Sequence, residues 1–491
     1  MAAVEQQGLR RGALGLVGLA TMGAVMMAPA LGLLGNWGPM AGIVGVGTPL
    51  VFLAAFVVSV PSAISYALLS REQPAAGSAY SWVARTIGHG TGTWVGLVMA
   101  GYYLTAVILQ PILFGLFFND LLAFCGVNSP GLATFFAGML VVTAIAAFTT
   151  YRGVALSGRT VVVTICIESA IVAALCLTIL FTKADHGYGL TLAPFNPSHI
   201  QGGLTAFWAA MILGILSYTG YDVISTVAEE TEAPRKLLPR ATGLAVVLVT
   251  VFWVVGAWLL SISTPVATVD KYTAANFTAV TGVANAYWGW GRILIIFVGM
   301  SAALGVYVAC VVGTSRAFYA LSRDGKLPAW LGQINQKTQT PWNAMHVVYG
   351  ATLVGIVAIV WWQGAAISGY VWWAGPITFF ALITYTMVNL SNLLYFTRIE
   401  RAKFNWFLNG LVPLVGMGLD IYLIYKSFFV SLWSLPFKSG PSIIWFCLLW
   451  CAVAFVIAVT RGRKNRMLTT ADGVIIVEGS TLDIERPEPA L

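Results

Sequence analysis

Ionisable residues are scarce inside the long apolar stretches of this sequence, so the few carboxylates found there are the first candidates for chemistry. They are Glu168, Asp222, Glu229, Glu230 and Asp420, with Asp120 near the outer end of another stretch. A charged side chain in hydrocarbon is costly unless it faces water or a partner, so such residues mark substrate or ion pathways. The same residues could also be structural hydrogen-bonding groups.

Asp222 directly follows Ser217-Tyr218-Thr219-Gly220-Tyr221, where the glycine weakens a helix. A carboxylate beside such a break could serve as the counter-ion of an ammonium group, or as a group that senses closure of a gate. Glu229 and Glu230 lie close to the basic residues Arg235, Lys236 and Arg240. For this pair we favour a solvated ion-pair network over contact with a substrate.

Glu168 lies in the middle of an apolar stretch, in Thr164-Ile165-Cys166-Ile167-Glu168-Ser169. Because burial penalises the charged form of a carboxyl group, Glu168 could bind and release protons, and we predict that it is the proton-coupling group. The alternative is a neutral glutamic acid that is hydrogen-bonded to a neighbouring backbone carbonyl.

Aromatic residues make up 13% of the chain, and most of them must be core or interface residues. Some could converge on a cavity and hold an ammonium group by cation–π attraction, or close over a substrate as a gate. These candidates are Tyr102, Tyr103, Tyr218, Tyr221, Tyr307, Trp372 and Trp373. The four histidines fall in loops or at the ends of apolar stretches, and the six cysteines lack metal-ligand spacing. We therefore expect no histidine proton relay, no metal site and no cofactor.

The composition shows which elements must position these residues. Of 491 residues, 58% are hydrophobic and only 9% are charged, which excludes a soluble globular protein. Crossing a bilayer core of about 30 Å takes about 20 apolar residues per helix. Twelve stretches qualify, at 14–34, 42–69, 92–124, 132–150, 161–181, 203–228, 244–263, 293–321, 345–362, 371–396, 408–432 and 443–459. We predict an all-α membrane protein with twelve transmembrane helices.

The basic residues between these stretches indicate the topology, because lysine and arginine accumulate on the cytoplasmic side. With a cytoplasmic N-terminus and an uncleaved first helix, only five of the 26 basic residues fall on the other side: Lys183, Lys271, Arg292, Lys426 and Lys438. We therefore expect both termini in the cytoplasm, with residues 461–491 forming a flexible tail. The net charge of +8 is a topology signal, and no nucleic-acid partner is expected.

Two of the twelve stretches contain helix breakers: the first has Gly23, Pro29 and Gly32, and the sixth has Gly220. Either break alone could be a simple kink. Because these stretches open successive groups of five, the pair is typical of an inverted repeat in which discontinuous helices 1 and 6 form a polar site at mid-membrane. The predicted units are 14–182 for the first repeat, 203–396 for the second and 408–460 for the last two helices.

Four segments resemble those of the amino acid-polyamine-organocation transporters over nearly the whole chain. Pro74-Ala75-Ala76-Gly77-Ser78-Ala79-Tyr80 is similar to the loop motif between helices two and three of this family. Tyr218-Thr219-Gly220-Tyr221-Asp222, continuing to Pro234-Arg235-Lys236-Leu237-Leu238-Pro239, resembles its helix-six region. The stretch from Ser315-Arg316 to Arg323-Asp324-Gly325-Lys326-Leu327-Pro328 and the later Thr340-Pro341 are similar to its signatures around helices eight and nine.

The resemblance implies a five-plus-five fold that rocks between outward-open and inward-open states. It also implies a substrate site between helices one, three, six, eight and ten. The candidate site residues are Gly23, Ala24, Val25, Met26, Tyr102, Tyr103, Tyr218, Thr219, Gly220, Tyr221, Asp222, Tyr307 and Trp372. Family members that bind amino acids carry a second glycine where this chain has Val25, which places carboxylate recognition by that route in doubt. Some putrescine importers of the family also lack that motif and begin helix one in a way similar to Gly18-Leu19-Ala20-Thr21-Met22.

These observations together predict a secondary active transporter of the cell membrane, whose substrate is an amino acid or a related small amine. We expect proton coupling or exchange, and we leave the oligomeric state open. The alternative substrate class is a polyamine or another organic cation. A membrane-embedded enzyme would need a metal cluster or a nucleophile–base pair inside the membrane, and a channel would need a ring of equivalent pore groups. The sequence favours neither.

Overall fold

The structure of the chain is a computed structural model. It describes residues 27–73, 78–153, 158–222, 234–274, 278–335, 337–338 and 340–461, together with two short backbone segments at 467–469 and 475–477. Residues Gly23, Ala24, Val25 and Met26, and the pair Glu229 and Glu230, lie outside this described part.

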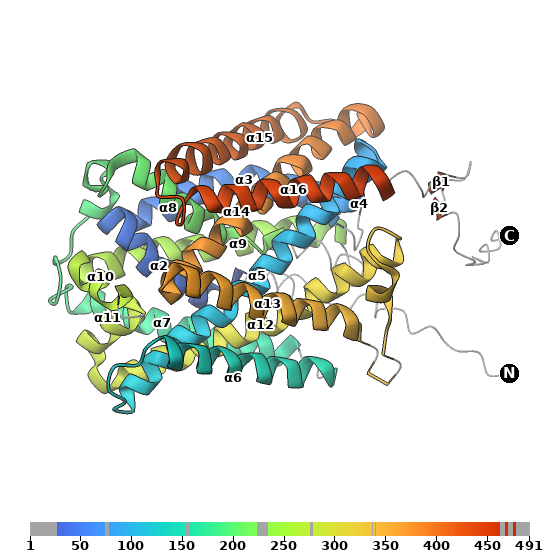
Figure 1. Cartoon of the computed structure of the whole chain (residues 1–491). Helices are drawn as coiled ribbons and strands as arrows, with labels where there is room; N and C mark the ends of the chain where they lie inside the picture. The colour runs from blue at the N-terminus through green and yellow to red at the C-terminus, as the bar shows by residue number, and fades with distance from the viewer. Residues whose placement is uncertain are drawn as a thin grey trace.

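The first half of the chain is built from helices that pass back and forth along one bundle (Figure 1). Their bounds are α2 Pro29–Val44, α3 Thr48–Glu72, α4 Ser78–Thr86, α5 His89–Phe124, α6 Leu132–Tyr151 and α7 Gly158–Phe181. The short 3-10 helices here are η1 Gly45–Gly47, η2 Ala193–Phe195 and η3 Pro197–His199.

The second half continues the bundle with α8 Gly203–Tyr218, α9 Pro234–Ser263, α10 Val266–Ala274, α11 Ala279–Trp288, α12 Arg292–Arg323, α13 Trp342–Gln363, α14 Ala366–Leu394, α15 Val412–Leu423 and α16 Pro441–Arg461. Further 3-10 helices are η5 Gly289–Gly291, η6 Ala329–Gly332, η8 Arg401–Lys403 and η11 Leu432–Ser434. The π-helical segments are η7 Tyr395–Ile399, η9 Trp406–Leu411 and η10 Ile424–Ser431. In the tail, β1 Met467–Thr469 pairs antiparallel with β2 Ile475–Val477.

Ten helical stretches in the described part of the chain are long and apolar enough to cross a membrane, and α8 is a shorter apolar helix. One of the ten, Pro29–Glu72, contains both α2 and α3. Outer helices such as α6 and α16 expose large apolar side chains, including Phe148 and Leu449. Such surfaces are suited to contact with lipid. The chain is therefore a multi-pass membrane protein.

The helix α5 lies at the centre of the bundle and packs against α6, α12, α13, α14 and α16. Small residues allow these close approaches. A Cβ atom at Gly299 of α12 would lie 2.4 Å from the ring of Phe117 on α5, and one at Gly115 of α5 would lie 2.7 Å from the ring of Phe135 on α6. Glycine at helix contacts is the usual means by which membrane helices pack closely.

The predicted gap between the first two apolar stretches is wrong, because α2 continues through residues 35–41 to Val44. Asn36 and Trp37, which lie in this gap, are buried and paired inside the bundle. The amide of Asn36 donates to Ser217 at 2.7 Å and accepts from Tyr370 at 2.7 Å, while the indole of Trp37 donates to Ser261 at 3.0 Å. Pro39 is accommodated within the helix, as prolines in membrane helices are when neighbours satisfy the backbone.

Candidate functional site

Asp222 lies where α8 stops. The α-helix ends at Tyr218, Thr219 has an extended backbone, and Gly220 has a φ of 112°, which side chains with a Cβ rarely adopt. The backbone N–H of Gly220 donates to Oδ1 of Asp222 at 3.1 Å, so the carboxylate folds back onto the broken end of the helix. Asp222 is only 3% exposed. The end of α8 therefore presents a buried carboxylate beside backbone that is not α-helical.

Five tyrosines surround this carboxylate, and we call them the tyrosine cluster: Tyr66, Tyr102, Tyr103, Tyr221 and Tyr385. They come from α3, α5, the end of α8 and α14. The hydroxyl of Tyr103 donates to Oδ2 of Asp222 and that of Tyr385 donates to Oδ1, both at 3.4 Å. All five rings lie close to the single carboxylate.

The rings of the tyrosine cluster also contact one another. Tyr66 meets Tyr221 edge to face, with ring centroids 5.8 Å apart, and meets Tyr385 in the same way at 5.7 Å. Tyr221 and Tyr385 are 5.1 Å apart, and Tyr102 and Tyr103 are 5.0 Å apart. Aromatic faces carry negative quadrupole charge, so this enclosure is suited to a cationic ligand.

The structure brings together six of the predicted site residues: Tyr102, Tyr103, Thr219, Gly220, Tyr221 and Asp222. Gly23, Ala24, Val25 and Met26 lie outside the described residues, and the remaining three lie elsewhere. Tyr218 turns away and donates to the carbonyl of Phe52, Tyr307 packs against Tyr349, and the indole of Trp372 donates to Ser442 on α16. Tyr66 and Tyr385 also belong to this site, and no sequence signal marks them, because neither lies near a helix break or a motif.

Glu168 on α7 is 5% exposed, and its Oε1 atom has no hydrogen-bond partner within the described residues. The carboxyl group faces the hydroxyl of Ser301 on α12, so it lies apart from the tyrosine cluster. Asp120 has a different role: it accepts hydrogen bonds from the hydroxyls of Thr278 and Thr281 and from the backbone N–H of Thr278, at the start of α11. These bonds make Asp120 a structural cap.

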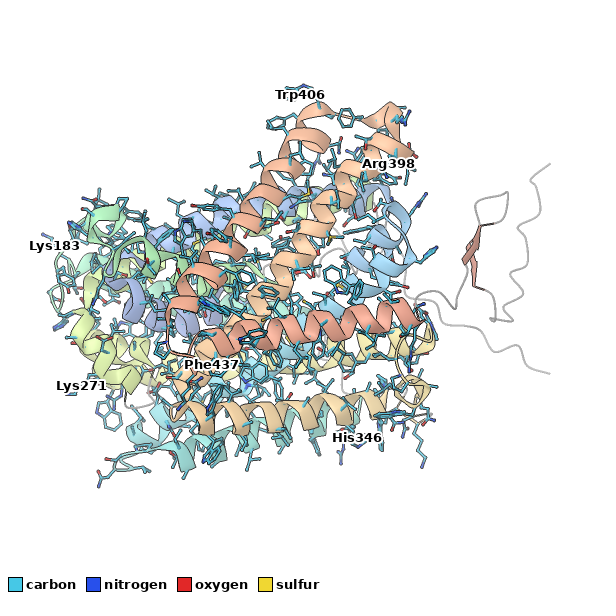
Figure 2. The ribbon with its side chains drawn as sticks, turned by 45° about the horizontal axis from the view of Figure 1, so that its top comes forward. Lys183, Lys271, His346, Arg398, Trp406 and Phe437 are labelled. Carbon is cyan, nitrogen blue, oxygen red and sulfur yellow. The ribbon has the colours of Figure 1, made fainter. Side chains whose placement is uncertain are left out.

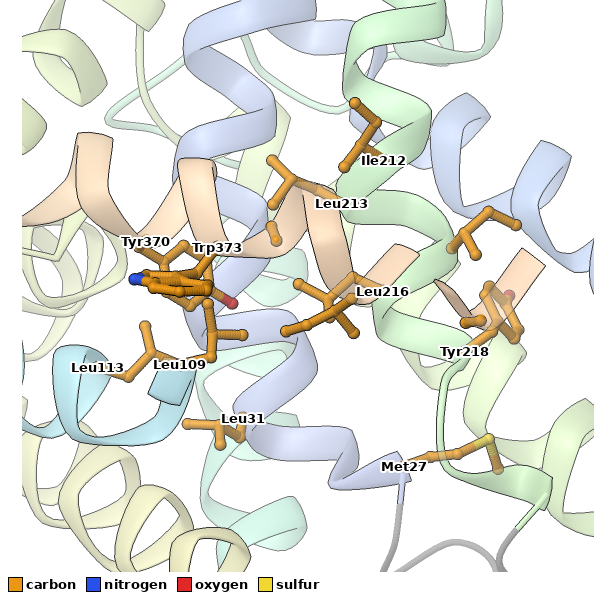
Figure 3. Close-up of a cluster of buried hydrophobic side chains, with 14 of the residues drawn as sticks. Met27, Leu31, Leu109, Leu113, Ile212, Leu213, Leu216, Tyr218, Tyr370 and Trp373 are labelled. Atoms are coloured by element: carbon orange, nitrogen blue, oxygen red, sulfur yellow. The ribbon is translucent and has the colours of Figure 1, made fainter. Parts of the chain in front are cut away.

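Apolar side chains fill the space between α2 and α8 on one side of the broken helix end (Figure 3). Leu31 of α2, Leu213 and Leu216 of α8, and Leu109 and Leu113 of α5 are all buried there. The helix α2 is also tied to α9, because the indole of Trp253 donates to the carbonyl of Pro29 at 2.9 Å. The two predicted discontinuous helices thus pack directly against each other along their described parts.

Two of the motifs meet at one end of the bundle, where α4 packs beside the end of α12. Burial, together with the charge of Asp324, raises the pKa of Tyr80 to about 12. Burial raises the pKa of Asp324 and lowers the pKa of Lys326. The ammonium group of Lys326 donates to the carbonyl of Arg461, which links the ends of α12 and α16. The motif residues therefore form an interhelical contact away from the tyrosine cluster.

The conformation of Gly220 leads to a prediction about stability. In Gly220→Ala, a residue with a Cβ atom must adopt the positive φ of this position, which is strained. We therefore expect a loss of about 1 to 3 kcal/mol in the free energy of unfolding, with weaker substrate binding. Thermal unfolding of the purified protein measures the loss. Gly305→Ala is the matched control, because Gly305 lies within α12 with open space around it. Equal melting temperatures for the two variants would show that the break at Gly220 is not strained by a side chain.

The amino-acid sequence is similar to those of known transport proteins. Residues 18–470 match the family described as amino acid permease. The low-affinity putrescine importer PlaP of Escherichia coli strain K12 is 26% identical over 466 residues, covering 93% of this chain and 95% of PlaP. The branched-chain amino acid permease BcaP of Lactococcus lactis is 28% identical over 330 residues, covering 64% of this chain and 68% of BcaP.

Among solved structures, the chain resembles the crystal structure of the Eremococcus coleocola manganese transporter in complex with an aromatic bis-isothiourea compound. The TM-score is 0.57 at 10% sequence identity, with 94% of this chain and 97% of the other covered. This likeness concerns the fold alone. The family and these relatives are transporters and not enzymes, and they are multi-pass proteins of the cell membrane. The chain belongs to the amino acid permease family, and so to the amino acid-polyamine-organocation transporters.

Proposed function

We propose that the protein is a secondary active transporter that moves an amino acid or a related small amine across the cell membrane by alternating access. The observation that carries this proposal is Asp222, a buried carboxylate at the broken end of α8 inside the tyrosine cluster. A carboxylate enclosed by aromatic faces at membrane depth can offset the cost of removing an ammonium group from water. The donors in its contacts with Gly220, Tyr103 and Tyr385 are all neutral, so these contacts leave the negative charge of Asp222 available to pair with a cationic substrate.

The proposed mechanism requires twelve crossings arranged as two inverted repeats, 14–182 and 203–396, followed by the last two helices. Support comes from α2 and α8, which lie side by side and each adjoin a break: Ala28 before α2 and Gly220 after α8 both have positive φ. The proposed sides are supported by the positions of Lys183 and Lys271 at one end of the bundle and of Arg398 at the opposite end (Figure 2). We therefore propose that the end with Arg398 and both termini face the cytoplasm.

A polyamine or another organic cation is the second candidate substrate class. Val25 replaces the glycine that would help to hold a substrate carboxylate, whereas the carboxylate of Asp222 and the tyrosine rings suit a cationic amine. The similarity to PlaP, which is named a putrescine importer, supports the same class. A channel remains the rival mechanism, and accumulation against a gradient distinguishes the two.

The deciding experiment uses the purified full-length chain. A thermal-shift screen of amino acids, polyamines and other amines first identifies a ligand, because a ligand that binds the folded state raises the melting temperature by mass action. Proteoliposomes then test uptake of that ligand with an imposed inward proton gradient. We expect accumulation above the external concentration, which vesicles without protein do not show. Uptake that only equilibrates the ligand, with or without a gradient, would refute proton-coupled accumulation.

A further inference from the structure

A second buried carboxylate lies outside the tyrosine cluster and has no role in the proposed function. Asp420 is on α15 and is only 1% exposed. Its Oδ2 atom accepts hydrogen bonds from the hydroxyl of Ser62 on α3 at 3.3 Å and from the amide nitrogen of Asn389 on α14 at 3.2 Å. The other oxygen, Oδ1, has no hydrogen-bond partner within the described residues. Three helices thus enclose a carboxyl group that is only half satisfied.

Other fully buried polar atoms near this group are also unsatisfied. Oδ1 of Asn389 and the hydroxyl of Ser59, one turn before Ser62, lack partners within the part of the chain that the structure describes. The enclosure is close, because a Cβ atom at Gly416, one turn before Asp420, would lie 2.6 Å from the amide nitrogen of Asn389. Glycine at position 416 therefore allows Asn389 to reach Asp420 and Ser62. Buried polar atoms without partners are rare and call for a ligand or another explanation.

The surroundings of Asp420 favour a proton over a metal cation. Burying an ionised carboxylate without a cationic partner is strongly unfavourable, because the charge loses its hydration. The group therefore requires a positive charge or a proton. The amide nitrogen of Asn389 points at both Asp420 and the hydroxyl of Ser62, which it meets at 2.8 Å. Nitrogen–hydrogen donors aimed into a site repel a metal ion. They are compatible with a protonated carboxyl group, which can still accept a hydrogen bond.

The helix α15 packs mainly against α3, α14, η9 and η10, and its Tyr422 also meets the ring of Trp208 on α8. The titratable groups on the inner side are Tyr66, Tyr385 and Tyr221, with Asp222 beyond them. From η9, Asn409 donates to Asn392 rather than to Asp420. From η10, Lys426 lies over the rings of the exposed residues Tyr422 and Tyr425. On its inner side, Asp420 therefore faces hydroxyl groups of the neighbouring elements.

These hydroxyls form a row between the two buried acids. Asp222 accepts from the hydroxyl of Tyr385 at 3.4 Å, and Asp420 accepts from that of Ser62 at 3.3 Å. Between them lies the hydroxyl of Tyr221, which faces both Tyr385 and Ser62. The hydroxyl of Tyr221 is fully buried, and in this conformation it forms no hydrogen bond with Tyr385 or with Ser62. It can rotate to accept a proton on one side and donate one on the other.

We propose that Asp420 is a proton-binding site of the transporter, joined to Asp222 by the hydroxyls of Tyr385, Tyr221 and Ser62. This inference rests on the proposed function only in that Asp222 belongs to the substrate site. In one passage, protonated Asp222 gives its proton to Tyr385, each hydroxyl accepts a proton and passes on its own, and Ser62 delivers one to Asp420. Asp222 ends as a carboxylate that can hold an amine, and Asp420 ends neutral.

Infrared spectroscopy of the purified full-length protein in lipid nanodiscs tests the site without any amine. At neutral pH we expect a carboxylic-acid C=O band that disappears in Asp420→Asn and is shifted but retained in Asp420→Glu. Glu168→Gln, which removes a different buried acid, should leave this band in place. A spectrum whose acid bands are the same in the parent and in Asp420→Asn would overturn the assignment. A band that is lost on adding sodium chloride at constant pH would instead identify a metal-cation site.

The exchange of this proton for deuterium tests the row of hydroxyls. After transfer to heavy water, the Asp420 band should shift in the parent, and Tyr221→Phe should slow that shift roughly 100-fold, the scale on which one positioned proton-transfer group acts. Tyr370→Phe is the matched control, because Tyr370 is also a fully buried tyrosine but its hydroxyl bonds to Asn36, outside the row. An unchanged rate in Tyr221→Phe would refute the connection. Because no substrate is present, these results are independent of whether the protein transports an amine.

Discussion

Asp222→Asn is expected to weaken the binding of an amine substrate by about 3 kcal/mol, or roughly 100-fold in Kd. The substitution keeps the shape of the side chain and leaves a carbonyl oxygen to accept from Gly220 and Tyr385, but it removes the negative charge and replaces the oxygen that accepts from Tyr103 with an amide nitrogen. Asp222→Glu keeps the charge in a displaced position and should retain part of the affinity. Thermal-shift titration with putrescine, L-leucine and the best ligand from the screen measures the effect.

The control for this comparison is Asp185→Asn, because Asp185 is an exposed acid between α7 and α8 whose side chain is 56% accessible. We expect it to bind like the parent. If Asp222→Asn and Asp222→Glu bind an amine equally well, Asp222 is not the counter-ion. If both variants bind like the parent but fail to transport, its role is to sense closure of the gate.

Glu168→Gln is expected to abolish the dependence of uptake on external pH. If Glu168 carries the coupled proton, a lower external pH raises its protonated fraction in the outward-facing state and increases uptake. The parent should then change by up to about tenfold per pH unit while the group titrates, as a single ionisation requires. Glutamine resembles the protonated acid but cannot release a proton, so its uptake curve should be flat. Initial rates in proteoliposomes with the internal pH held constant measure both curves.

The matched control for Glu168→Gln is Glu400→Gln, because Glu400 is a partly exposed acid whose nearest cation is Lys403 at 3.7 Å. Its pH profile should follow that of the parent. A Glu168→Gln profile that also follows the parent would refute proton coupling through this residue and would leave Glu168 as a structural acid beside Ser301. In that case Asp420 would be the remaining candidate for carrying the coupled proton.

The experiments on Glu168 and on Asp420 test two different acids in separate parts of the bundle. Glu168 faces α12 from α7, whereas Asp420 lies between α3, α14 and α15. The pH profile reports which acid limits transport, and the infrared band reports which acid holds a proton at rest. Measuring both in each single variant distinguishes a coupling proton from one that only keeps the bundle neutral.

The amino-acid sequence is sufficient to identify this chain as a helical membrane protein of the amino acid permease family and to locate most of its helices. Hydrocarbon excludes charge and unsatisfied backbone, so apolar stretches and breakers such as Gly220 are visible in one dimension. It also pointed to Asp222, because a carboxylate within an apolar stretch stands out wherever it lies. The continuation of α2 through Asn36 was missed, because its polar partners Ser217 and Tyr370 are distant in the chain.

Only the tertiary structure decided which side chains meet. Tyr66 and Tyr385 are unremarkable in the sequence, and they join Asp222 because α3 and α14 pack beside the end of α8. Tyr218 is the last residue of α8 and points to Phe52, whereas Tyr221 lies beyond the break, where the backbone has left the helix and turns the side chain towards other neighbours. The hydroxyls between Asp222 and Asp420 come from α3, α14 and the end of α8. No local pattern encodes such a convergence, because it arises from the packing of helices that are far apart along the chain.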